Sequence, residues 1–262
     1  MQTNRLLPLL VTALGLFCLT SASAGTLQQV LSKGSLRVGV TLAAPWAIRD
    51  ESGEFEGFEI DIARKLAADM DVEIEFLRYD YDELIRALEA GEIDLIAAGL
   101  TITPDRALHV NFSRPYATSG VGIATNLEST EEVEFLEQLN DPEYTIAAMA
   151  DSVAEDLVGR IMPRARLETY RSPDAATEAL IAGDVDAYLD EEPIPSFLAL
   201  EYPRQVDVPV NRPILETRSA FAVTKGDPDF LAFLNAWIEA READTWLPTT
   251  HQYWFKTLQW RD

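Results

Sequence analysis

An arginine, two threonines and a glycine lie close together in the stretch Gly99–Arg106, which reads GLTITPDR. Arginine presents a planar guanidinium whose paired N–H donors match a carboxylate, and threonine adds a hydroxyl and a backbone N–H. Glycine lets the backbone come close to a bound molecule. These groups suit the binding of a carboxylate. They also suit a capped helix start with a surface arginine, and the chemistry alone leaves both interpretations open.

Few other residues of the chain could carry out chemistry. It has two histidines, His109 and His251, and one cysteine, Cys18. Zinc sites need clusters of His and Cys at set spacings, and a nucleophile needs an adjacent base. We therefore expect no metal and no cofactor, and the chain offers little material for His-based acid/base or nucleophilic catalysis. A formal net charge of -23 repels phosphates, which argues against nucleic acid and anionic lipid as partners.

The first 24 residues have the pattern of an export signal. Arg5 precedes an apolar run at 6–19, and the small residues Ala22-Ser23-Ala24 follow. This pattern predicts a secretory signal peptide that is cleaved after Ala24 and takes Cys18 with it. The alternative is an uncleaved membrane anchor, which needs about 20 apolar residues and no cleavage motif.

Strand and helix patterns alternate along the rest of the chain. β-branched or alternating runs predict strands, and apolar residues at helical spacing predict helices. We expect strands at 36–41, 72–79, 93–98, 144–149, 167–170 and 187–190, and helices at 58–70, at 81–90, from 152, and at 175–182. This order gives two α/β units, each with a mostly parallel sheet covered by helices. The GLTITPDR stretch then leaves the carboxyl end of a strand, where open α/β sheets bind ligands.

Several motifs resemble those of one family, in the same order along the chain. They are PW at 45–46, EGFEID at 56–61, ALEAGEIDLIAAGLTITPDR at 87–106, NFSRPY at 111–116 and FAVTKGDPDF at 221–230. Together they resemble the family 3 solute-binding proteins, the polar amino-acid receptors of ABC importers. On this resemblance Arg106 is a binding residue rather than a surface one.

The resemblance implies an α/β fold of the type II periplasmic-binding-protein kind, with two lobes joined by two crossover segments. Lobe 1 would comprise residues 25–122 and 222–262, and lobe 2 residues 123–221, with crossovers near Gly122–Asn126 and Arg218–Ala222. Closing the lobes would bury an amino acid or similar small polar solute and present a new surface to a membrane permease. The protein would act in the periplasm as a monomer.

The resemblance also assigns residues to the ligand's charged groups. Arg106, with Thr101 and Gly99, would hold the α-carboxylate. An acid from lobe 2 would meet the ammonium, and the register of the strand at 187–190 puts Glu191 there.

Aromatic residues and a helix start complete the implied site. Trp46 and Tyr81 would enclose the ligand side chain, although each also suits ordinary packing. Many relatives have a Gly-Thr-Gly-like loop after the first strand of lobe 2, where this chain has Ala150-Asp151-Ser152. Ser152 would supply a hydroxyl and cap the helix, whereas Asp151 adds a negative charge beside the expected carboxylate. The resemblance therefore does not specify the identity of the ligand's side chain.

Two other functions are compatible with this resemblance. Periplasmic cyclohexadienyl dehydratases are similar and add an acid to the pocket, but at the expected position, three residues after Glu191, this chain has Ile194. General acid catalysis needs a donor within hydrogen-bond reach, which favours a receptor over an enzyme. A free-standing ligand sensor is the remaining alternative.

Overall fold

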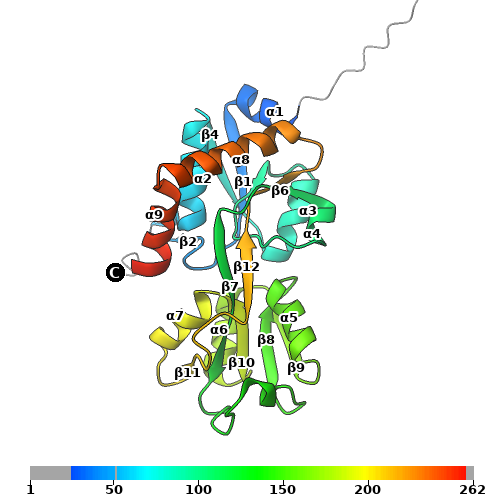
Figure 1. Ribbon diagram of the computed structural model, residues 1–262, viewed down its shortest axis with the longest axis vertical. Coiled ribbons are helices and arrows are strands. Elements are labelled where there is room, and N and C mark those ends of the chain that lie inside the picture. Colours follow the sequence, from blue (N-terminus) through cyan, green and yellow to red (C-terminus); the bar gives the residue numbers. More distant parts are fainter. Residues whose placement is uncertain (1–24, 51, 258–262) are drawn as a thin grey trace, which may run out of the picture.

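The computed structural model describes residues 25–50 and 52–257, so the expected signal peptide at 1–24 lies outside the described residues. Two α/β lobes are joined by two long strands (Figure 1). Each lobe has its own sheet with helices packed on it, which confirms the expected fold class. Within the described residues, no helix has both the length and the apolar character needed to cross a membrane.

The sheet of the first lobe has the order β4-β1-β5-β13-β6. Its strands are β1 (Ser35–Val40), β4 (Glu73–Arg78), β5 (Leu95–Ile96), β6 (Val110–Phe112) and β13 (Ala222–Thr224). β1 is parallel to β4 and β5, whereas β13 is antiparallel to β5 and β6. The helices are α1 (Thr26–Lys33), α2 (Phe58–Asp69), a 3-10 turn (Tyr81–Glu83), α3 (Leu84–Glu89), α4 (Arg106–His109), α8 (Pro228–Ala243), α9 (Trp246–Gln252) and a π-helical turn (Tyr253–Thr257). A hairpin of β2 (Ile48–Arg49) and β3 (Phe55–Glu56) completes the lobe.

The sheet of the second lobe has the order β11-β7-β10-β8-β9, with β12 paired to β7. Its strands are β7 (Ala117–Asn126), β8 (Thr145–Met149), β9 (Arg166–Tyr170), β10 (Ala187–Glu191), β11 (Val206–Asp207) and β12 (Leu215–Ser219). β8 is parallel to β9 and β10, and β7 is antiparallel to β10. The helices are a 3-10 turn (Leu136–Leu139), α5 (Val153–Ile161), α6 (Pro173–Ala182) and α7 (Ile194–Glu201).

Local signals explain where the helices nearest the cleft between the lobes begin. The Ser152 hydroxyl accepts the backbone N–H of Glu155 at 3.1 Å, so it caps α5. Helix α2 begins after Gly57, whose φ is +129°. A Cβ on Gly57 would lie 2.4 Å from the carbonyl oxygen of Trp46, so only glycine fits there.

The two connections between the lobes form an antiparallel ribbon. Residues 117–121 of β7 pair with residues 215–219 of β12, and both strands run from lobe to lobe (Figure 1). The expected first crossover at Gly122–Asn126 is wrong, because Val121–Thr125 already pair with β10 inside the second sheet. That apolar run is a buried strand, and the connection precedes it. The chain returns to the first sheet between β12 and β13, within the expected 218–222 segment.

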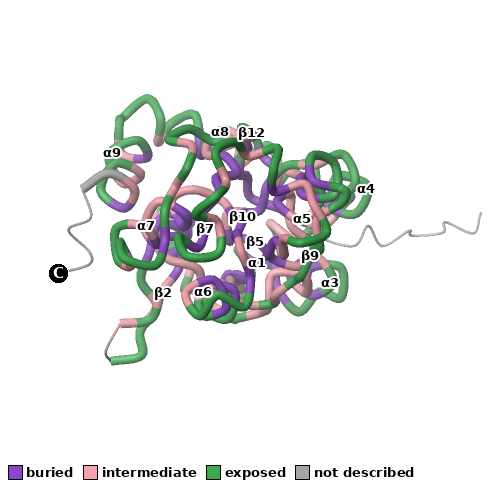
Figure 2. Tube along the Cα trace, turned by 90° about the horizontal axis from the view of Figure 1, so that it is seen from below, coloured by how far each residue is buried: buried purple, intermediate pink, exposed green. Residues whose placement is uncertain are grey.

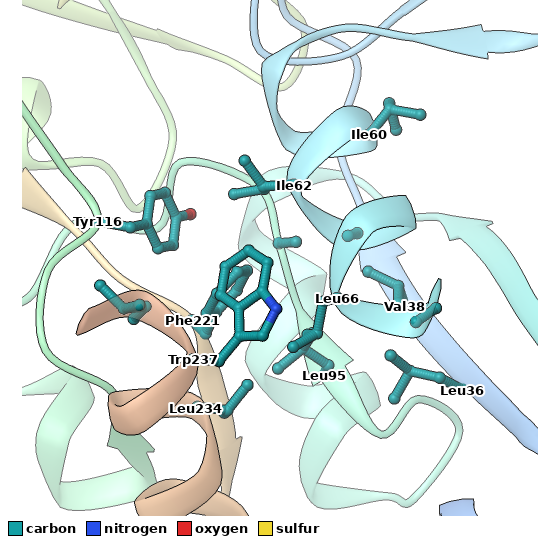
Figure 3. Packing of buried hydrophobic residues seen from close by; sticks show 14 of the residues in the cluster. Leu36, Val38, Ile60, Ile62, Leu66, Leu95, Tyr116, Phe221, Leu234 and Trp237 are labelled. Carbon is teal, nitrogen blue, oxygen red and sulfur yellow. The ribbon is translucent and has the colours of Figure 1, made fainter. Parts of the chain in front are cut away.

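Each lobe buries its own apolar core. In the tube coloured by burial, the buried residues gather along the central strands and the inner faces of the helices (Figure 2). The core of the first lobe joins β1, α2 and β5 to α8, and Trp237 of α8 packs near Phe221 with ring centroids 6.0 Å apart (Figure 3). Since each core is separate, the lobes can move relative to each other without exposing either one.

Candidate functional site

A cavity of about 60 Å³ lies between the lobes at the carboxyl ends of β5, β8 and β10. A single water needs roughly 10–15 Å³ by this kind of measure, so the cavity has room for more than one. Six of the seven residues predicted from the sequence line it, namely Trp46, Tyr81, Gly99, Thr101, Ser152 and Glu191. Both lobes therefore face one space, at the edge where α/β sheets bind ligands.

Arg106, the seventh predicted residue, lies beside the cavity and is 9% exposed. Its Nη1 donates to Thr101 O at 2.9 Å and to the Tyr81 hydroxyl at 3.2 Å. Its Nη2 donates across the cleft to the carbonyl oxygen of Asp151 at 2.6 Å. The surface-arginine alternative is therefore wrong. The guanidinium is held behind two residues that line the cavity, and it also bridges the lobes.

The loop between β5 and α4 holds this arrangement in place. Gly99 has a φ of +62°, a left-handed conformation that favours glycine. The hydroxyl of Thr103 accepts the backbone N–H of Arg106 at 3.2 Å and so fixes the start of α4. Ile102 N donates to Arg218 O at 2.9 Å, which ties the loop to the connecting ribbon. The motif thus positions Arg106 by local capping and by contact with β12.

Trp46 both packs in the core and lines the cavity. It is 4% exposed and makes edge contacts with Phe58 and Phe255 at centroid distances of 5.9 and 4.6 Å. A Cβ on Gly99 would lie 3.3 Å from the Trp46 ring, so the glycine lets the backbone approach the indole. Tyr81 is half-buried, and the Arg106 guanidinium lies 5.2 Å from the centre of its ring.

Two neighbouring acids, Asp190 and Glu191, line the second-lobe side of the cavity. Glu191 accepts a hydrogen bond from the Thr217 hydroxyl, and burial raises its pKa to about 7. Asp190 accepts hydrogen bonds from the Tyr188 hydroxyl and from Glu191 N, and burial raises its pKa to about 6. Both carboxyls can ionise near neutral pH and would then attract a cation.

The sequence did not assign Asp190 to the cavity. Side chains alternate between the two faces of a strand, so two successive residues are not expected to share one surface. β10 ends at Glu191, however, and both acids border the space beyond its carboxyl end. An acidic pair at the very end of a buried apolar strand was the available signal.

Asp151, whose side chain we expect to add a negative charge beside the ligand carboxylate, contacts Arg106 through its backbone. Its contact with Arg106 is made by the backbone carbonyl oxygen, and its backbone N–H donates to the Glu155 carboxylate at 2.7 Å. Asp151 has a φ of +55°, the conformation that glycine adopts most easily. This turn aims an acceptor, rather than a carboxylate, at the guanidinium. The remaining lining residues are Thr41, Ala43, Ala98, Met149, Val153, Ala154, Pro173 and Ile194.

An ion pair joins the lobes beside the cavity. Arg171, in the loop before α6, donates to the Asp82 carboxylate and lies 3.8 Å from that of Asp80. The Asp82 side chain is 7% exposed, and within the described residues its Oδ1 is buried without a hydrogen-bond partner. Asp82 follows Tyr81 in the chain, so the pair fastens one cavity wall to the opposite lobe.

We expect Arg171→Gln to weaken the closed form. An ion pair with one exposed partner is worth up to about 1 kcal/mol, which corresponds to about a fivefold higher Kd for a ligand held between the lobes. The effect should shrink in high salt because the arginine is exposed. Calorimetry in low and high salt measures it. Arg164→Gln, which breaks a pair with Asp141 inside the second lobe, is the control, and an equal loss in both variants would contradict the role across the cleft.

Three comparisons with known proteins agree with this geometry. The profile of bacterial extracellular solute-binding proteins, family 3, matches residues 36–257. L-cystine-binding protein TcyJ of Escherichia coli (strain K12) is 23% identical over 238 residues, which cover 89% of this chain and 87% of TcyJ. The ancestral amino acid-binding protein AncCDT-1, a precursor of cyclohexadienyl dehydratase, has a TM-score of 0.81 at 30% identity, covering 89% of this chain and 100% of that one. A binding component of an ABC transporter from Wolinella succinogenes DSM 1740, solved with lysine, has a TM-score of 0.81 at 28% identity, covering 87% of this chain and 99% of that one.

Proposed function

Because this chain belongs to the family 3 bacterial extracellular solute-binding proteins, we propose that it captures an α-amino acid between its lobes and delivers it to an ABC importer. One observation carries the proposal: the buried guanidinium of Arg106 from the first lobe and the half-buried carboxyl of Glu191 from the second flank the same cavity. A zwitterion presents one group for each. The lobes would close on it by a hinge motion.

The ligand carboxylate would bind at Arg106. A guanidinium has five N–H donors, and the hydrogen bonds to described residues use three of them. The remaining donors can pair with a carboxylate, together with the hydroxyl of Thr101 and the N–H groups that begin α5 at Ser152. The ammonium would bind at Glu191, with the rings of Trp46 and Tyr81 beside the ligand side chain.

The charge of the cavity limits which amino acids fit. Asp190 and Glu191 together carry up to two negative charges, against one positive charge on Arg106. A second carboxylate on the ligand would lie near these acids without a cation to pair with, which is costly in a buried site. We therefore infer that basic and neutral amino acids bind and that acidic ones do not. The Wolinella succinogenes relative, solved with lysine, is consistent with the binding of a basic amino acid.

A thermal-shift screen tests the function. The refolded, ligand-free protein is heated with single amino acids, polyamines and small carboxylates. A ligand at about 100 times its Kd adds roughly 2.7 kcal/mol of stability, so a bound amino acid should raise the melting temperature clearly. Glutamate and aspartate should leave it unchanged. A shift with carboxylates or polyamines and with no amino acid would contradict the proposal.

We also propose that the protein is a receptor and not an enzyme. The position where a dehydratase would need an added acid holds Ile194, whose apolar side chain lines the cavity. A dehydratase is the alternative, with Glu191 as its proton donor, because a carboxyl with a pKa of about 7 can act as a general acid. Incubation with prephenate or arogenate should give no aromatic product.

Localisation and partners follow the family, whose members are extracellular. We propose a periplasmic monomer that starts at Gly25 after cleavage at Ala24, which mass spectrometry of the exported protein checks. The two lobes on either side of the β7 and β12 ribbon would move as two bodies, and the closed form would dock on an inner-membrane permease. A ligand sensor without a permease remains the alternative, and a neighbouring permease gene would separate the two.

A further inference from the structure

We propose that Glu59, a buried carboxyl that does not line the cavity, is a positioning residue that ties the ligand-facing loop at Gly99 to both strands connecting the lobes. The proposal rests on the proposed function for its ligand readout. Its structural readout, described below, needs no ligand.

Glu59 lies in the first turn of α2 and is 0% exposed. Its Oε1 accepts the backbone N–H of Gly99 at 2.9 Å, and the Tyr116 hydroxyl lies 2.9 Å from each of its carboxyl oxygens. Its own backbone N–H donates to Trp46 O at 2.8 Å. One residue thus contacts two segments that line the cavity and the start of the first connecting strand.

The hydrogen bonds close into a ring of four residues. The Ser219 hydroxyl, on β12, donates to Gly99 O at 3.2 Å. Tyr116 N donates to Ser219 O at 3.0 Å. The ring therefore runs from Glu59 to Gly99, from Gly99 to Ser219, from Ser219 to Tyr116, and back to Glu59. It includes the last residue of β12, the residue that precedes β7, and one residue that lines the cavity.

Three of the four residues in this ring are buried, and the fourth, Gly99, is half-buried beside the cavity. Ser219 is 0% exposed and Tyr116 is 6% exposed. The Tyr116 ring packs beside Phe221 with centroids 4.6 Å apart, at the edge of the first-lobe core (Figure 3). A buried N–H without an acceptor is costly, so Gly99 N depends on the Glu59 oxygen. Burial also raises the pKa of Glu59 to about 8, so the carboxyl is largely neutral at pH 7 and a neutral amide can replace it as the acceptor.

The ring of hydrogen bonds couples the hinge between the lobes to the cavity. The lobes can change their angle only by bending the ribbon of β7 and β12, and Tyr116 and Ser219 lie at its first-lobe end. A change there moves the partners of Gly99, and ligand contacts at Gly99 bias the ribbon in return, because coupling between two sites is reciprocal. Without Glu59 the loop would keep its direct bonds to β12, from Ile102 N to Arg218 O and from Ser219 Oγ to Gly99 O, but it would lose its link to Tyr116 at the start of β7.

The test uses the ligand-free full chain and compares Glu59→Gln with Glu59→Met. The amide keeps an acceptor for Gly99 N–H, and the thioether does not. Amide hydrogen exchange followed by NMR reports local opening. In Glu59→Met the amides of Gly99 and Tyr116 should exchange about tenfold faster or more, as expected for loss of one buried hydrogen bond. Amides of β8 and β9 should be unchanged. Glu59→Gln should behave as wild type.

Two further variants keep the result interpretable. Asp61→Met removes another carboxyl of α2, which accepts the Trp254 Nε1–H at 2.7 Å outside the ring, and it should not alter exchange at Gly99. If Glu59→Met does not fold, Ser219→Ala breaks a different link and should loosen the same two amides. Equal acceleration throughout both lobes, or unchanged exchange at Gly99, would overturn the proposal.

The ligand readout separates this proposal from the function. With the best amino acid from the screen, Glu59→Met should raise the Kd about fivefold or more while Glu59→Gln leaves it near wild type. If no amino acid binds the wild-type protein, the proposed function fails, and hydrogen exchange still decides the role of Glu59. If an amino acid binds the wild type and Glu59→Met with equal affinity, the coupling is wrong although the function holds.

Discussion

Arg106→Met is expected to weaken the binding of an amino acid by about 150-fold to several thousand-fold. The substitution would leave the ligand carboxylate buried without its charged partner, which costs about 3–5 kcal/mol. Methionine keeps much of the stem packing, so the main change is the loss of the guanidinium. Isothermal titration calorimetry at micromolar ligand measures the effect, and binding should be undetectable there.

The cavity contacts of Arg106 require a control for stability. The substitution also removes hydrogen bonds to Thr101 O, Tyr81 and Asp151 O, which we expect to cost the ligand-free protein about 1–3 kcal/mol. The corresponding amino acid amide, which lacks the carboxylate, isolates the binding effect. The amide should bind Arg106→Met almost as well as it binds the wild type, because it has no carboxylate for the arginine to contact. Near wild-type affinity for the amino acid itself would show that another group recognises the carboxylate.

The affinity for an amino acid is expected to rise about 100-fold between pH 5 and pH 8. Burial raises the pKa of Glu191 to about 7, so at pH 5 only about one protein in a hundred has the ionised form that an ammonium prefers. Ligand binding should therefore release a proton. Titrations in two buffers with different ionisation enthalpies measure both the affinity and the proton.

The folding stability that Glu191 contributes should fall as pH rises, whereas the affinity rises, and this difference in sign provides a check. An acid whose pKa is higher in the folded than in the unfolded state stabilises the fold below the unfolded value, and this stability is lost as pH rises through the folded value. For Glu191 that window runs from about 4.5 to about 7. The ligand-free protein should thus lose stability over the range in which affinity rises. Glu191→Gln should bind weakly at every pH. Glu192→Gln, one residue beyond the strand end, should keep a pH-dependent profile that is shifted to lower pH, because the Glu192 charge helps to raise the pKa of Glu191. A flat profile in the wild type would exclude Glu191 as the ammonium partner.

The features that the sequence predicts correctly have local signals. The strand and helix order around the cleft follows from hydrophobic periodicity, and the α5 start follows from the Ser152 cap. The position of Arg106 followed from its place after a buried strand. These features depend on residues within a few positions of each other. Such residues are close in space whatever the tertiary structure.

Features that depend on distant segments could not be predicted. The bond from Arg106 to Asp151 O spans 45 positions of the chain, and the pair of Arg171 with Asp82 spans 89. No spacing in the sequence marks either. The first crossover was misplaced because a fully buried strand and an apolar linker have the same composition. Glu59 stands in the EGFEID motif between Phe58 and Ile60, and neither the motif nor the helix pattern indicates its contacts with Gly99 and Tyr116.

The ribbon of β7 and β12 also limits the path along which the molecule can open. Its two strands are paired residue by residue over five positions, from Ala117–Ser219 to Val121–Leu215. A paired ribbon bends and twists about its thin direction, whereas stretching or sliding one strand would break the ladder. The two lobes are thereby confined to almost one degree of freedom, a hinge rotation about the ribbon. Ligands of different size would stop this rotation at different closure angles. None of them could slide one lobe past the other.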